Sequence, residues 1–166
     1  MDNLIVFTDG SFRKKYNYCG YGVHFPNKEM KSYGNVFKLE NPTNQRAELY
    51  AIYSALKRCI LILKTKQYKE INIFSDSDYS IKCLTLWYKK WEKNKWKTKD
   101  KKDVSNQDLI KKILNLMGKI KIKIFFFHVN SHTGKKDYNS VNNDIVDKLA
   151  NLKFFKSLKE NQKSKC

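Results

Sequence analysis

The sequence predicts an α/β fold: one mixed sheet of five strands flanked by helices. Two observations predict it. Apolar, β-rich segments alternate with helical ones in the order three strands, helix, strand, helices, strand, helix. Only turn-length segments separate the first three strands, which should pair antiparallel, whereas helical sequence precedes each later strand, as in a crossover connection. A chain of 166 residues is long enough to fold as a single domain without metal or disulfide staples.

The first part of the chain contains three short strands and one long helix. The strand patterns cover 4–9, 18–25 and 31–39, and "PNKE" supplies a turn between the second and the third. Helical periodicity follows over 41–63, where apolar residues recur at steps of three or four: Leu49, Ile52, Leu56, Ile60 and Leu63. Thr43 or Asn44 is the N-cap candidate.

The rest of the chain alternates strands with helices. The predicted elements are a strand over 70–76, a helical stretch from about Tyr79, a helix over 105–117, a strand over 119–129 and a final helix that begins in 142–152. Ser105 or Asn106 caps the middle helix. The last strand alternates Lys with Ile before it turns wholly apolar, so we expect it to enter the core. The lysine-rich residues 154–166 should form a frayed, solvated tail, rather than a nuclear address or a membrane patch.

The charge balance points to a polyanionic partner. The chain has 34 basic and 16 acidic residues, a net charge of +18 and a pI near 9.7. Nucleic acid is the first expectation and an anionic membrane surface the second. Three of the basic residues are arginines, which leaves 34 − 3 = 31 lysines. Lysine suits phosphate contacts, whereas base readout favours arginine, so we expect backbone binding with little sequence preference.

The cysteines and the apolar segments indicate the cellular compartment in which we expect the protein. Cys19, Cys59, Cys83 and Cys166 form no metal-ligand spacing, and Cys59 and Cys83 lie in helical apolar patterns. Buried free thiols indicate a reducing, intracellular compartment, either cytoplasm or nucleus. The sequence shows neither a signal peptide nor an apolar run long enough to cross a bilayer, so we expect no membrane association.

Four carboxylates lie where a predicted element meets a turn, in a chain that is short of acids. Asp9 and Asp76 end apolar strands, Glu48 lies in the first turns of the long helix, and Asp147 lies near the start of the final helix. Each alone could be a turn or capping residue. Together they predict a cage for hard divalent cations. Two such ions about 4 Å apart can clamp the attacking and leaving oxygens of a phosphodiester, and Mg²⁺ suits oxygen ligands, although Mn²⁺ is also compatible.

Five motifs in order carry a family resemblance. "FTDGS", "TNQRAEL", "FSDSDY", "HVNSH" and "NNDIVDKLA" resemble the catalytic domain of type 1 ribonuclease H. The resemblance runs from about Leu4 to Leu152, and "WYKKWEKNKWKTKDKK" is similar to that family's basic protrusion. It implies a ribonuclease H-like fold, a catalytic domain over 1–153, a protrusion over about 87–104 and a lysine-rich tail over 154–166.

The resemblance also implies a reaction. The expected activity is endonucleolytic hydrolysis of the RNA strand of RNA–DNA hybrids, with 5′-phosphate and 3′-hydroxyl products. Asp9 would bridge two metal ions, Asp147 would complete the site of the ion that activates water, and Glu48 and Asp76 would hold the other ion. His132 falls on the family's mobile-loop histidine, which assists proton transfer or product release.

Further positions match the family's substrate contacts. Asn44 and Gln45 would contact RNA 2′-hydroxyls, because amides both donate and accept hydrogen bonds, although Asn44 could instead be only a cap. Thr43 and Asn106 match a pocket for a DNA phosphate. The protrusion would bind the hybrid through interleaved aromatic and basic side chains: Trp87, Lys90, Trp91, Lys93, Lys95 and Trp96.

Two departures and two rival interpretations remain open. Lys15 falls near a position where the family has an RNA-side asparagine, and Asn41 replaces an arginine of the phosphate pocket. One rival is another nuclease of the same fold, resolvase- or integrase-like. The other is a non-catalytic, lysine-rich nucleic-acid-binding protein. We expect a monomer with no protein partner.

Overall fold

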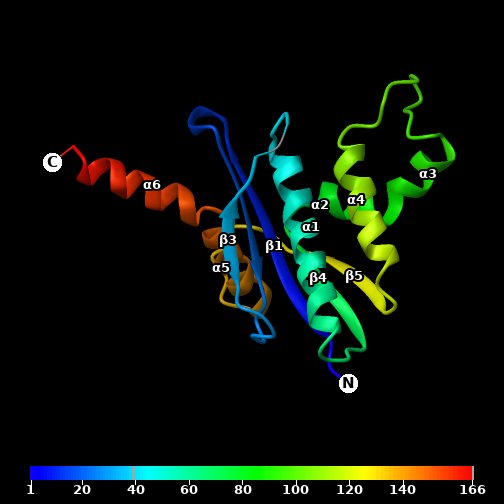
Figure 1. The fold of residues 1–166 in the computed structure, drawn as a ribbon, viewed down its shortest axis with the longest axis horizontal. Coiled ribbons are helices and arrows are strands. Elements are labelled where there is room, and N and C mark those ends of the chain that lie inside the picture. Colours follow the sequence, from blue (N-terminus) through cyan, green and yellow to red (C-terminus); the bar gives the residue numbers. More distant parts are fainter. Residues whose placement is uncertain (39, 166) are drawn as a thin grey trace.

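The computed structural model describes residues 1–38 and 40–165, and its centre is a five-stranded sheet in the order β3-β2-β1-β4-β5 (Figure 1). β1 (Leu4–Arg13), β2 (Tyr18–His24) and β3 (Tyr33–Val36) are antiparallel, and a 3₁₀ turn joins the first two. β4 (Glu70–Ser75) runs parallel to β1, and β5 (Lys123–His128) runs parallel to β4. The predicted mixed sheet, with three antiparallel strands first, is confirmed.

Helices cover both faces of this sheet. α1 (Asn44–Leu63) and α4 (Gln107–Gly118) lie on one face, and α5 (Tyr138–Ala150) lies on the other (Figure 1). α2 (Asp78–Lys82), a π-helical turn and α3 (Tyr88–Lys93) form one helical stretch that leads away from the sheet. α6 (Leu152–Lys163) projects from the body at the opposite side (Figure 1). None of the described helices is both long and apolar enough to cross a membrane.

The core follows the two-residue alternation of the strands. Leu4 and Val6 of β1 are fully buried against the apolar side of α1, together with Ile71 and Ile73 of β4. Phe7 points to the opposite face, where it packs with Val146 of α5. The sheet is therefore buried on both faces at β1 and β4, as expected for parallel strands between helical layers.

Two expectations about the elements are wrong, and a third holds for one face only. β5 is an edge strand: Ile124 and Phe126 pack against the core, whereas Phe125 and Phe127 are each 41% exposed. The final helix begins at Tyr138, which places Asp147 in its third turn rather than near its start. The tail forms α6 rather than a frayed end.

Smaller differences between the predicted and the observed elements concern the lengths of two strands. The third strand is shorter than predicted, and the predicted end at Leu39 lies outside the described residues, as does Cys166. The first strand is longer, because its antiparallel pairing with β2 continues from Phe7 to Arg13. The predicted buried thiols Cys59 and Cys83 are confirmed as buried and free.

Candidate active site

Three carboxylates converge where β1 and β4 part. Thr8 is the last residue of β1 that pairs with β4, and beyond it β1 pairs with β2 alone. Asp9 lies at this fork, in the middle of a strand rather than at its end as predicted. Asp76 follows the last residue of β4, and Glu48 lies in the second turn of α1. Carboxylate oxygens of the three residues lie within 4.8 Å of one another. The fork is the point where the strand order reverses, which is where open α/β sheets bind ligands.

A glycine brings Glu48 to this fork. A Cβ at Gly10 would lie 2.3 Å from the backbone of Ala47 and of Glu48, so only glycine lets β1 approach α1 this closely. The backbone N–H of Gly10 also donates a hydrogen bond to the Glu48 carboxylate, which acts to lower the pKa of that group. The "DGS" sequence thus supplies the carboxylate of Asp9 and, through Gly10, the space that lets Glu48 approach it.

The fourth carboxylate comes from the opposite face. α5 packs so closely on the sheet that a Cβ at Gly34 would lie 1.8 Å from the carbonyl oxygen of Leu149. This close approach brings Asp147 beside Asp9, where a hydrogen bond between the two carboxyl groups acts to raise the pKa of Asp9. Asp147 lies outside the compact group of three, although its charge also acts on Glu48 and Asp76.

The electrostatics of the cluster favour a cation. Burial, followed by repulsion from Glu48 and Asp76, raises the pKa of Asp9 well above its usual range. Burial and the charge of Asp76 likewise raise the pKa of Glu48. Burial and the charge of Asp147 raise the pKa of Asp76. In addition, Oε2 of Glu48 is shielded from solvent and has no hydrogen-bond partner among the described residues. Mutually repelling carboxylates, one of them with an unpartnered oxygen, fit divalent cations, because oxygen ligands of this kind are what Mg²⁺ and similar ions take.

Asn143 is a further residue of this site, and no sequence-based prediction pointed to it. This side chain is 2% exposed, hydrogen-bonds to Asp76 and thereby acts to lower the pKa of that carboxylate. Its Oδ1 atom is buried without a partner in the part of the chain that the structure describes. Asn143 precedes Asp147 by four residues, which places the two on one face of α5. That spacing is the signal that could have identified it.

His132, matched to a mobile-loop position of the family, lies in the exposed segment between β5 and α5. Its backbone has a φ of 52°, in the left-handed region. Its charge acts to lower the pKa of Asp76.

A second missed residue, Arg46, joins the two halves of the predicted phosphate pocket. Oγ1 of Thr43 accepts a hydrogen bond from the backbone N–H of Arg46 at 3.1 Å, which makes Thr43 the N-cap of α1. The guanidinium donates to Oδ1 of Asn106 at 3.3 Å and makes two bonds to Asp108, at 2.9 and 2.8 Å. Asn106 occupies the N-cap position of α4 with a φ of 62°, and its side chain makes no capping hydrogen bond. Arg46 is buried, and so it holds the start of α1 against the start of α4.

The other predicted substrate residues are at the surface. Asn44 and Gln45 are exposed in the first turn of α1, one turn before Glu48 of the acidic cluster. In the protrusion, the rings of Trp87 and Trp91 are 5.9 Å apart and those of Trp91 and Trp96 are 6.0 Å apart. Trp91 and Trp96 pack against the core, whereas Trp87 is 38% exposed. The lysines of this segment are exposed: Lys89, Lys90, Lys93, Lys95, Lys97 and Lys99.

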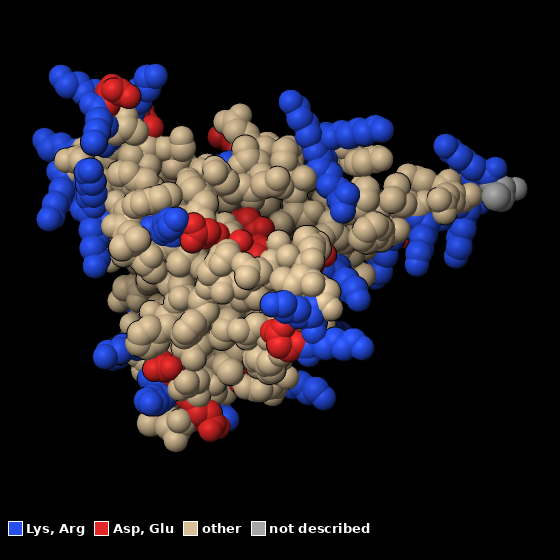
Figure 2. Space-filling view, turned by 180° about the vertical axis from the view of Figure 1, so that it is seen from behind, with Lys and Arg blue, Asp and Glu red and all other residues tan. Residues whose placement is uncertain are grey.

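Acidic and basic side chains gather in different regions of the surface. Figure 2 shows acidic side chains in a hollow at the middle of one face, with basic side chains over the protrusion at one side and along α6 at the other.

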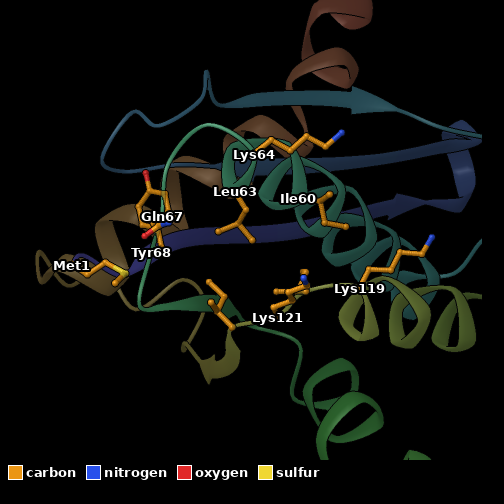
Figure 3. A pocket seen from close by; sticks show the side chains of 10 residues that line it. Met1, Ile60, Leu63, Lys64, Gln67, Tyr68, Lys119 and Lys121 are labelled. Carbon is orange, nitrogen blue, oxygen red and sulfur yellow. The ribbon is translucent and has the colours of Figure 1, made fainter.

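A separate hollow of about 500 Å³ lies between the ends of α1 and α4 and the start of β5. Its lining is mainly apolar, with Ile60, Leu63 and Tyr68 among it, and Lys64 and Lys119 extend away from these side chains (Figure 3). None of the described carboxylates lines it, so it does not share the chemistry of the acidic cluster.

Comparison with known proteins agrees with this geometry. A family model described as RNase H matches residues 1–154. The chain belongs to the RNase H family. The resemblance drawn from the five motifs is therefore confirmed, and with it the assignment to the hydrolases, among the nucleases.

Individual relatives cover most of the chain. A ribonuclease H of Schizosaccharomyces pombe is 35% identical over 148 residues, which are 87% of this chain and 52% of that protein. The chain thus spans about half the length of that relative. A ribonuclease H of Orientia tsutsugamushi is 33% identical over 165 residues, 96% of this chain and 89% of that protein. The crystal structure of RNase H1 from Halobacterium salinarum has a TM-score of 0.59 at 20% identity and covers 90% of this chain and 95% of its own, which shows a shared fold. RNase H enzymes require divalent metal ions, and the acidic cluster is consistent with this requirement.

Proposed function

We propose that this RNase H cleaves the RNA strand of RNA–DNA hybrids endonucleolytically, leaves 5′-phosphate and 3′-hydroxyl ends, and has little sequence preference. The observation that carries the proposal is the group formed by Asp9, Glu48 and Asp76, with Asp147 beside it. Four carboxylates from three layers of a strongly basic protein would repel one another and the substrate unless cations were bound between them. We propose two such ions, Mg²⁺ or alternatively Mn²⁺.

The residues have distinct tasks in this proposal. Asp9 would hold both ions, Asp147 would complete the site of one of them, and Glu48 and Asp76 would complete the site of the other. When bound, the ions neutralise the carboxylates and stabilise the negative charge that develops on the phosphodiester. Asn143 holds the Asp76 carboxylate in one orientation through its hydrogen bond. His132 lies in an exposed loop and its charge acts on Asp76, and an imidazole at such a position can carry a proton to or from solvent.

Substrate choice depends on both strands. Asn44 and Gln45, exposed at the start of α1, contact 2′-hydroxyls of the RNA strand. Thr43 and Asn106, held together by Arg46, receive a phosphate of the DNA strand, since their backbone N–H groups lie at two helix starts. The protrusion adds a hollow of about 380 Å³ that fits a sugar–phosphate chain; its lining includes Trp87, Lys90, Trp91, Asn94 and Lys97. A monomer suffices for all of these contacts.

The test compares three labelled duplexes of equal sequence: RNA–DNA, RNA–RNA and DNA–DNA. With Mg²⁺, wild-type protein should cut only the RNA of the hybrid. Asp76→Asn should lose at least about 10³-fold in rate, because a ligand and its charge are removed while the volume is kept. Asp2→Asn, at an exposed position near the N-terminus, makes the same change of charge away from both the cluster and the protrusion and should cut normally.

Each other outcome has a definite meaning. Cleavage of the DNA–DNA duplex would favour a resolvase-like nuclease. Binding without cleavage of any duplex would favour a non-catalytic binding protein. Full activity in Asp76→Asn would show that the acidic cluster is not the catalytic centre.

A further inference from the structure

Helix α6 lies almost entirely beyond the family match, which ends at residue 154. Over twelve residues it carries four lysines and one acid: Lys153, Lys156, Lys159, Lys163 and Glu160. All five are exposed. A free, flexible tail would be the simple interpretation of such a composition. The contacts at the base of the helix argue against it.

The base of α6 is fixed to the strand that carries Asp9. Oδ1 of Asn151 accepts hydrogen bonds from the Ser11 hydroxyl at 2.7 Å and from Nε and Nη2 of Arg13 at 3.2 and 3.1 Å. The Asn151 side chain is buried, and its amide donates to the backbone carbonyl of Asp147 at 3.0 Å. One side chain therefore links α6, β1 and the turn of α5 that holds the fourth carboxylate.

Aromatic packing reinforces this joint. Phe154 is buried, and its ring lies 5.0 Å from that of Tyr16 and 5.4 Å from that of Tyr18. The Arg13 guanidinium stacks over Phe154 at 4.4 Å. Tyr16 at the hairpin tip and Phe155 remain 53% and 50% exposed. The aromatic packing fixes the position of neighbouring basic side chains, which supply the positive charge that phosphate contacts require.

We infer that α6 and the tip of the β1–β2 hairpin form a second cationic contact for the duplex backbone. It lies on the opposite side of the acidic cluster from the protrusion, an arrangement visible in Figure 2. The inference rests on the proposed function for the position of the duplex. A twelve-residue helix is about 18 Å long, enough to follow about three phosphates of one strand. Arg13, Lys14 and Lys15 at the hairpin tip begin the contact, and Lys156, Lys159 and Lys163 extend it along α6.

The experiment measures binding in the absence of divalent metal, by fluorescence anisotropy with labelled RNA–DNA and DNA–DNA duplexes of equal length and sequence. The test variant is Lys156→Gln/Lys159→Gln/Lys163→Gln. Its matched control is Lys64→Gln/Lys119→Gln/Lys121→Gln, which removes three exposed lysines at the end of the molecule near the N-terminus (Figure 3). Glutamine keeps the helix propensity of lysine, so α6 should remain folded, which circular dichroism checks.

The α6 variant should bind both duplexes at least about eightfold more weakly at 0.1 M salt for each phosphate that its lysines no longer neutralise. The slope of log K against log salt should become shallower by about 0.9 for each such phosphate, while the control should change affinity less than about twofold. Conversely, Glu160→Lys should bind more tightly than wild type, and Asp2→Lys, with the same change of charge near the N-terminus, should not.

Equal losses of affinity in the two triple variants would overturn the inference, since they would show only the effect of net charge. So would a gain in Glu160→Lys no larger than that in Asp2→Lys. Because binding is measured without metal and on both duplexes, a failure of the proposed RNA cleavage would leave this result interpretable.

Discussion

Removing one acid from the crowded cluster should stabilise the metal-free protein. Carboxylate oxygens of Asp9, Glu48 and Asp76 lie within 4.8 Å of one another. At an effective dielectric constant of about 20, two charges at that distance repel by about 332/(20 × 4.8), or about 3.5 kcal/mol. Partial protonation relieves some of this cost, which is why burial and repulsion raise the pKa of Asp9. We expect Asp9→Asn to raise the free energy of unfolding by about 2–4 kcal/mol at pH 8.

The sign of the pH dependence follows from the same shift. The folded-state pKa of Asp9 is raised above the unfolded value of about 3.9, so protonation of Asp9 favours the folded state of the protein. Stability of the wild-type protein should fall as the pH rises from about 4 through the raised pKa. The advantage of Asp9→Asn should therefore be small at pH 4 and full at pH 8.

Urea denaturation in EDTA, followed by circular dichroism at pH 4 and pH 8, measures the effect. In a chain of this length, about 2–4 kcal/mol corresponds to a melting temperature higher by about 5–15 °C. Millimolar Mg²⁺ should stabilise the wild type and leave Asp9→Asn nearly unchanged. Asp100→Asn is the control for net charge. If the two variants were equally stable at pH 8, the carboxylates would not repel in the folded state, and the case for a cation cage would fail.

Three further predictions concern the residues around the cluster. Gly10→Ala should destabilise the protein by about 1–3 kcal/mol and reduce hybrid cleavage, because its Cβ would overlap the α1 backbone; unchanged urea midpoint and activity would contradict this. Asp108→Asn should cost about 1 kcal/mol at pH 7, since the side chain is 56% exposed. The Arg46 hydrogen bonds lower the pKa of Asp108 to about 2, so this stabilisation should disappear as the pH falls from about 4 to about 2, and a pH-independent cost would contradict the ion pair. Asn143→Ala should weaken Mg²⁺ binding in calorimetry by about tenfold, and an unaltered affinity would rule out its positioning role.

Local patterns in the sequence were sufficient to predict most of the elements and, of the four predicted carboxylates, the positions of two. Asp76 at the end of β4 and Glu48 in the second turn of α1 follow from where an apolar strand stops and where a 3.6-residue period starts. Both signals depend only on neighbours in the chain. The basic composition and the tryptophan-rich protrusion are likewise visible without any tertiary information.

Other features depended on contacts between distant segments. The prediction that 119–129 enters the core holds for one face only, because Ile124 and Phe126 pack against the core whereas Phe125 and Phe127 are exposed. An apolar strand looks the same in sequence whether one or both of its faces are covered. The tail was expected to fray, because lysine-rich composition does not reveal that Asn151 and Phe154 fasten α6 to β1. Arg46 and Asn143 were missed because their significance lies in partners tens of residues away.

By itself, the sequence determined which acids are available, the order of strands and helices that carries them, and the family to which their motifs point. The tertiary structure decided that Asp9 lies at a fork between two strands rather than at a strand end. It also brought Asp147 from the third turn of α5 to the opposite side of that fork. The physical reason is close packing: strand and helix identity are set by local periodicity, whereas the positions of these carboxylates depend on backbones that touch at Gly10 and Gly34.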